Sequence, residues 1–157
     1  MSPPPLVALP ALALLLIAVA HDLRSRTIPD AVSVALVALA AVATSCGWHD
    51  VSWSALLGGA ASAFALGAAL FYLGAMGGGD AKLCAGIGAL CGWPKAFEVL
   101  FATALWGGVV SLIAKRRGAT AVPYAPAIAA GYVTTVAVRW SAPPRAGLWD
   151  WITGVSL

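Results

Sequence analysis

The chain has 157 residues, of which 61% are hydrophobic and 10% charged, and nine Lys/Arg against six Asp/Glu give a net charge of +3. Soluble domains carry about 25% charged residues, so the composition predicts an integral membrane protein. We expect one membrane domain over residues 1–157, with no soluble domain and with the lipid bilayer as a partner. The basic residues form no patch with interleaved aromatic side chains, which argues against nucleic acid as a partner.

The first apolar segment, residues 3–21, is long enough to cross a membrane, which takes about 20 helical residues. Residues 18–20 resemble a signal-peptidase site, so a cleaved signal peptide is the alternative interpretation. A signal peptide carries its positive charge before the apolar stretch, whereas Arg24 and Arg26 come after this one. We therefore expect a retained first span.

A polar segment from His21 to Asp30 follows this span. Pro29 disfavours helix at Ile28 and suits the start of a second helix, with Asp30 at the positive end of its dipole. Asp22 would end the first helix, where a negative charge is unfavourable. It is therefore not placed there to stabilise that helix, which favours a functional role for Asp22.

Further apolar segments predict an all-α fold with about six transmembrane helices. The one at residues 83–93 is short for a span and suits a thinned bilayer or a helix with little tilt. Small residues from Gly58 to Ala69 predict close helix packing. Prolines 123 and 126 interrupt regular hydrogen bonding at the start of the last apolar segment, residues 122–138. In chain order these segments are residues 31–48, 51–79, 83–93, 99–114 and 122–138.

Six spans place most of the basic residues on one face. That face holds six of the nine Lys/Arg, so the positive-inside rule makes it cytoplasmic and puts both termini outside. The first and third spans run in the same direction, and Asp22 and Asp80 therefore reach the cytoplasmic face together. The six basic residues are Arg24, Arg26, Lys82, Lys115, Arg116 and Arg117.

Residues 77–83, with the sequence GGGDAKL, place Asp80 after three glycines. Glycine lets another backbone come close and permits dihedrals closed to other residues, so an acid here suits chemistry on an extended peptide. We predict that Gly77, Gly78 and Gly79 contact the substrate. The structural alternative is a helix that ends in glycine and a new helix capped by Asp80. Lys82 has two interpretations, contact with lipid phosphate or an influence on the charge of Asp80.

Two carboxyl groups held close together share a proton and titrate as a pair. One can take a proton from water while the other polarises a peptide carbonyl. Asp22 and Asp80 therefore predict aspartic-type peptide hydrolysis with a rate that is bell-shaped in pH, and without a metal or other cofactor. The three cysteines lack CxxC spacing and clustered histidines, so no zinc site is expected.

Two other functions remain compatible with the same acids. Acidic residues within membranes are common in proton- or ion-coupled transporters, but no inverted repeat or pair of broken helices is visible in the sequence. A non-catalytic scaffold, in which both acids cap helices, leaves their joint pattern unexplained. Cleavage of a co-expressed substrate separates these possibilities.

The two acidic motifs together resemble the prepilin peptidases, which are polytopic GxGD-type aspartic proteases. The resemblance rests on the sequence DLRxRxIP at residues 22–29, on GGGDxKL at 77–83, and on PYxPAI at 123–128. It implies that Asp22 and Asp80 are the catalytic aspartates. Asp30 matches no catalytic position, and we interpret it as a helix-start residue.

Longer members of that family carry a cytoplasmic domain with paired CxxC motifs and also methylate the new pilin N-terminus. This chain begins directly at its first span and has no CxxC, so it resembles the short, peptidase-only members associated with Flp/Tad-type pili. The resemblance implies a prepilin or pseudopilin substrate with a short basic leader. It also implies an active site at the cytoplasmic face of the bacterial inner membrane.

Overall fold

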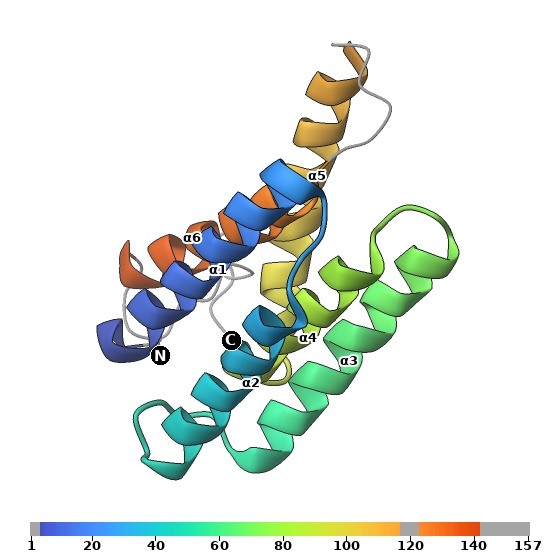
Figure 1. The fold of residues 1–157 in the computed structure, drawn as a ribbon. Coiled ribbons are helices and arrows are strands. Elements are labelled where there is room, and N and C mark those ends of the chain that lie inside the picture. Colours follow the sequence, from blue (N-terminus) through green and yellow to red (C-terminus); the bar gives the residue numbers. More distant parts are fainter. Residues whose placement is uncertain (1–3, 117–122, 142–157) are drawn as a thin grey trace.

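The computed structural model describes residues 4–116 and 123–141, and its secondary structure within them is helical (Figure 1). The predicted all-α class is confirmed. Arg117, which the charge argument used, lies outside the described residues. The helices are α1 (Pro5–Ser25), α2 (Asp30–Ser45), α3 (Trp53–Tyr72), α4 (Gly78–Cys91), α5 (Ala96–Arg116) and α6 (Ala125–Ser141).

Three of these helices, α1, α3 and α5, are long and apolar enough to cross a membrane within the part of the chain that the structure describes. They have 21, 20 and 21 residues, and their outer faces carry exposed leucine and phenylalanine side chains. These features indicate an integral membrane protein. The shorter α2 is also apolar, and α4 has only 14 residues, in keeping with the short segment predicted there.

The third apolar segment ends earlier than predicted. We expected one uncharged run from residue 51 to residue 79, but α3 ends at Tyr72 and the last glycines of the run begin α4. Gly74 causes the break, because its φ of 70° is left-handed and turns the chain away from the helix axis. The stretch around Asp80 is therefore the start of a helix, as the structural alternative proposed.

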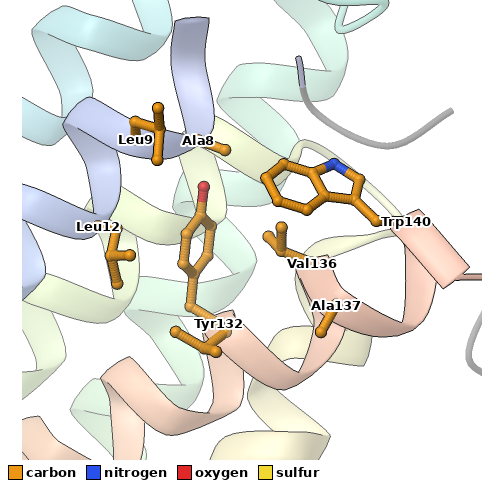
Figure 2. A pocket seen from close by; sticks show the side chains of 8 residues that line it. Ala8, Leu9, Leu12, Tyr132, Val136, Ala137 and Trp140 are labelled. Carbon is orange, nitrogen blue, oxygen red and sulfur yellow. The ribbon is translucent and has the colours of Figure 1, made fainter. Parts of the chain in front are cut away.

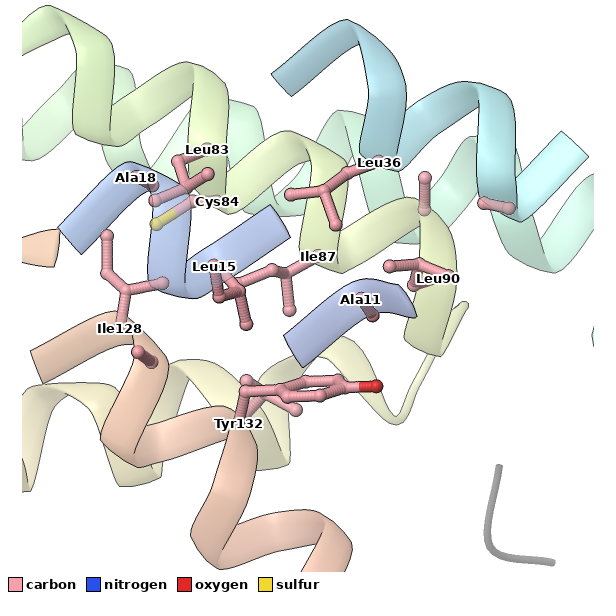
Figure 3. Packing of buried hydrophobic residues seen from close by; sticks show 14 of the residues in the cluster. Ala11, Leu15, Ala18, Leu36, Leu83, Cys84, Ile87, Leu90, Ile128 and Tyr132 are labelled. Atoms are coloured by element: carbon pink, nitrogen blue, oxygen red, sulfur yellow. The ribbon is translucent and has the colours of Figure 1, made fainter. Parts of the chain in front are cut away.

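Helix α4 is the centre of the bundle. It packs mainly on α3 and α2 and also contacts α5 and α6, while α1 lies between α2 and α6. Most residues of α4 are buried against the other helices, so this short helix contacts protein along most of its length. Figure 3 shows α4 side chains among those of α1, α2 and α6; the labelled residues are Leu83, Cys84, Ile87, Leu90, Ala11, Leu15, Ala18, Leu36, Ile128 and Tyr132.

Helices α3 and α4 touch through their backbones. A Cβ atom added to Gly88 would overlap the carbonyl oxygen of Gly59, and one added to Gly59 would overlap that of Gly88. A Cβ on Gly67 would lie 2.8 Å from the Cα of Ala81. The close packing predicted from the small residues of this segment is confirmed, and it fixes the position of α4 along α3.

Helices α1 and α6 run side by side in opposite directions (Figure 1). Between them lies a cavity of about 130 Å³, which is lined by apolar side chains and by the ring of Tyr132 (Figure 2). Leu12, which lines it, precedes Asp22 by ten residues, or about 15 Å of helix at 1.5 Å per residue. The cavity is therefore separate from the acidic residues.

Candidate functional site

The two acidic motifs meet where α1 ends and α4 begins. A Cβ atom added to Gly79 would lie 3.3 Å from the Cβ of Ile28, so the first turn of α4 packs on the segment between α1 and α2. Asp22 is 7% exposed and Asp80 is 8% exposed. The two carboxyl groups are close enough for their charges to interact. The structure thus brings together two acids that are separated by nearly sixty residues of sequence.

Asp22 lies in the last turn of α1 and bonds to the start of a different helix. The left-handed backbone of Arg26, with φ 53°, ends α1, and the Arg26 N–H donates to the main-chain oxygen of Asp22. The Asp22 side chain accepts a buried hydrogen bond at Oδ2 from the Ala125 N–H, with a length of 3.1 Å. Because helix N-termini favour negative charge, α6 offers Asp22 the stabilisation that its own helix denies it.

Asp80 lies in the first turn of α4, and its two carboxyl oxygens differ. Oδ2 accepts a hydrogen bond of 3.1 Å from the Gly77 N–H and so caps the helix, as the structural alternative proposed. Oδ1 is buried and has no hydrogen-bond partner among the described residues. A buried polar atom without a partner costs about 1–3 kcal/mol. Oδ1 is therefore the atom of this site that is suited to bind a further group.

The glycines before Asp80 provide space rather than unusual dihedrals. Gly77 has a φ of −77°, and Gly78 and Gly79 are helical, so all three have ordinary backbone dihedrals in this structure. A Cβ atom on Gly77 would lie 2.9 Å from Oδ2 of Asp80. Gly77 and Gly79 thus let two neighbouring groups approach closely, the Asp80 carboxyl group and Ile28.

Lys82 bonds to Asp30. Its Nζ lies 2.8 Å from both carboxyl oxygens of Asp30, and the two side chains are 51% and 68% exposed. Lys82 and Asp80 are two residues apart on a helix and therefore point to different sides. Asp30 is in the first turn of α2, as predicted, and it also connects that turn to α4.

Tyr124 closes the site on the side of α5 and α6. A Cβ atom on Gly107 of α5 would lie 2.5 Å from the Tyr124 hydroxyl oxygen, and Tyr124 directly precedes Ala125, whose N–H bonds to Asp22. The sequence reasoning noted residues 123–128 but assigned no role to Tyr124 or Ala125. The sequence did contain a sign of such a role. Proline has no backbone N–H, so the prolines at 123 and 126 leave only the N–H groups between them to donate at this helix start.

The model of the type IV leader peptidase family matches residues 9–112 of the chain. The chain belongs to this family. Asp22 and Asp80 both lie within the matched residues, whereas Ala125 and the rest of α6 lie beyond them. The family predicted from the two acidic motifs is thereby confirmed.

The chain is also similar to the prepilin leader peptidase/N-methyltransferase of Bacillus subtilis (strain 168). The two are 34% identical over 128 residues, which cover 78% of this chain and 51% of the relative. The chain thus spans about half the length of this curated relative. No solved structure matches the chain.

Proposed function

We propose that the chain is an aspartic endopeptidase of the bacterial inner membrane that removes the leader of Flp-like prepilins or pseudopilins. The observation that carries the proposal is the pair of buried carboxyl groups, Asp22 and Asp80, contributed by two separate motifs at one end of the bundle. Oδ1 of Asp80, which is buried and has no partner among the described residues, supports it further, because an aspartic peptidase needs a carboxyl oxygen whose hydrogen bonds are not already used.

The reaction that suits this pair is the addition of water across the peptide bond. One carboxylate takes a proton from water while the water oxygen bonds to the carbonyl carbon, and the other carboxylic acid gives its proton to the carbonyl oxygen. The tetrahedral intermediate then collapses. The C–N bond breaks, a proton passes to the leaving nitrogen, and the products are a carboxylic acid and an amine.

The substrate backbone is proposed to lie along Gly77, Gly78 and Gly79. The first N–H groups of a helix have no partner within that helix, so those of Gly78 and Gly79 suit a substrate carbonyl. The Gly77 N–H already donates to Asp80. Its part in binding is to leave the approach to the carboxyl group open.

Location and substrate range form the finer part of the proposal. The excess of Lys/Arg near Arg24, Lys82 and Lys115 supports a site at the cytoplasmic face. The resemblance to short peptidase-only members supports an Flp-like substrate and cleavage without methylation. We treat residues 1–157 as one prepilin-peptidase domain.

The test is cleavage of a purified prepilin by wild-type enzyme in detergent, compared with the variants Asp22→Asn and Asp80→Asn. Asparagine keeps the size of aspartate but cannot exchange its proton, so each variant should lose cleavage while inserting into the membrane at normal levels. Asp30→Asn is the matched control and should cleave. Mass spectrometry of the product should show a free, unmethylated N-terminus.

Substantial cleavage by either purified variant at Asp22 or Asp80 would refute the catalytic pair. A transporter that uses the same acids predicts a different result, namely proton flux into liposomes that depends on Asp22 and Asp80 and no cleavage of prepilin. A methyl group that depends on this chain would contradict the peptidase-only part alone.

A further inference from the structure

The segment from Pro123 to Ile128 takes no part in the mechanism above, yet its first helical residue touches the site. The main-chain oxygen of Tyr124 accepts hydrogen bonds from the N–H groups of Ala127, at 3.0 Å, and Ile128, at 3.1 Å. Proline at position 126 has no N–H to donate. The N–H of Ala125 is therefore the donor that this first turn directs at Asp22.

The bond from Ala125 to Asp22 joins residues that are 103 positions apart, and it is buried. A backbone donor is more rigid than a side chain, because it is fixed by the helix that it begins. The basic side chain of α4, Lys82, is bound to Asp30. Within the part of the chain that the structure describes, the hydrogen bond to the Asp22 side chain comes from the N–H at the start of α6, where the helix dipole favours negative charge.

Asp80 has a different environment. Its Oδ2 is bonded to Gly77 in its own segment, and its Oδ1 is buried without a partner among the described residues. A proton on Oδ1 makes that atom a hydrogen-bond donor, which is what a peptide carbonyl oxygen requires. The Asp22 carboxylate, which is bonded to a helix N-terminus, is suited to act as the base, since it can accept a proton from water.

We infer that Ala125 is a positioning residue whose N–H holds the Asp22 carboxylate as the base, leaving Asp80 to donate its proton from Oδ1. This assignment rests on the proposed function. In the first step the proton of water passes to Asp22, the water oxygen bonds to the carbonyl carbon, and the Asp80 proton passes to the carbonyl oxygen. Ala125 itself touches neither water nor substrate.

The experiment removes the N–H of Ala125 and leaves every side chain unchanged; the Tyr124 carbonyl becomes a weaker acceptor for the Ala127 and Ile128 N–H groups. Replacing Ala125 by its α-hydroxy acid changes the amide to an ester and deletes the donor without adding atoms. The same replacement at Ala127 is the matched control, because it deletes an N–H that donates within α6 to Tyr124. We expect the ester at 125 to lower kcat on prepilin about ten- to a hundredfold, with KM within about twofold. The ester at 127 should leave kcat within about threefold.

A second pair of variants tests the same bond in cells. Ala125→Pro also removes the N–H, and the fixed φ of proline suits the first position of a helix, whereas Ala125→Gly keeps the donor. The glycine variant should process prepilin and the proline variant should process it at least tenfold more slowly. Equal activity within either pair, or a loss confined to KM, would overturn the inference.

These outcomes are distinguishable from a failure of the proposed function. If Asp22→Asn cleaves normally, the catalytic pair itself is wrong. If Asp22→Asn is inactive while the two esters behave alike, the pair stands and only the role of Ala125 is wrong.

Discussion

Gly77 has little room for a side chain beside the Asp80 carboxyl group. A Cβ atom there would lie 2.9 Å from Oδ2 of Asp80, closer than the two atoms can sit without movement. Gly77→Ala should therefore displace the Asp80 carboxyl group. Because small misplacements of a catalytic group are costly, we expect kcat to fall on the order of ten- to a hundredfold, measured on purified enzyme with prepilin.

Gly108→Ala is the control for this change. Gly108 lies in α5, and a Cβ atom there has nothing within 4 Å. This variant tests the chemical change from glycine to alanine without a neighbour to displace, and it should keep wild-type kcat. Wild-type activity in Gly77→Ala would show that the approach to Asp80 does not depend on a bare backbone.

At the scale of single residues, the sequence singles out two acids but does not predict what they contact. Asp22 and Asp80 stand out because a carboxylate is costly near a membrane and each follows an apolar segment. The bond from Ala125 to Asp22 could not be predicted, because it depends on how α1 packs against α6. The partner of Lys82 was missed for the same reason, since Asp30 belongs to another helix.

The ion pair between Lys82 and Asp30 connects the first turn of α2 to the N-terminal half of α4. Both side chains are more than half exposed, at 51% and 68%, so water screens their attraction. We expect Asp30→Asn to lower the free energy of unfolding by at most about 1 kcal/mol and to leave prepilin cleavage intact. Denaturant unfolding in detergent, with Lys82→Gln and the double variant, measures the coupling between the two side chains. A coupling well above that range, or lost cleavage, would show that the pair supports the site.

The backbone contact between α3 and α4 has no room for added atoms. Alanine at position 88 would overlap the carbonyl oxygen of Gly59, and α3 would have to move away. We expect Gly88→Ala to lower the free energy of unfolding by about 1–3 kcal/mol, measured by denaturant unfolding in mixed micelles. Gly108→Ala again serves as the control. A stability equal to wild type would mean that α3 and α4 adjust freely to each other.

At the scale of helices, the sequence predicts the number and order of elements. It does not predict which side of each helix is buried, because lipid-facing and core-facing residues in a membrane protein are equally apolar. In α1, Leu15 is 1% exposed and its neighbour Leu16 is 57% exposed. No pattern of polar and apolar residues separates the two.

At the scale of the whole molecule, the site forms where three chain segments meet. Helix α1 brings Asp22, α4 brings Asp80, and α6 brings the N–H that bonds to Asp22. The order of charges along the chain predicts that the first two reach the same face. The contribution of α6 follows from its antiparallel course beside α1, which Figure 1 shows. The geometry of the candidate site is a property of the bundle rather than of either acidic motif.

The orientation of the bundle can be tested with two cysteines at opposite ends of α2. Cys46 is exposed and follows the end of α2 at Ser45. Ser25 is exposed and lies just before its start. The 16 residues of α2 separate the two positions by about 24 Å. The positive-inside rule places Ser25 in the cytoplasm, because Arg24 and Arg26 flank it.

We therefore expect a membrane-impermeant maleimide to label native Cys46 in spheroplasts. In a Cys46→Ser background, Ser25→Cys should be labelled only in inverted vesicles. Detergent-solubilised protein, in which both positions should react, is the control for accessibility. Labelling of position 25 only from outside would reverse the bundle. It would also place Asp22 and Asp80 on the side of the membrane opposite to the cytoplasm, where prepilin is made.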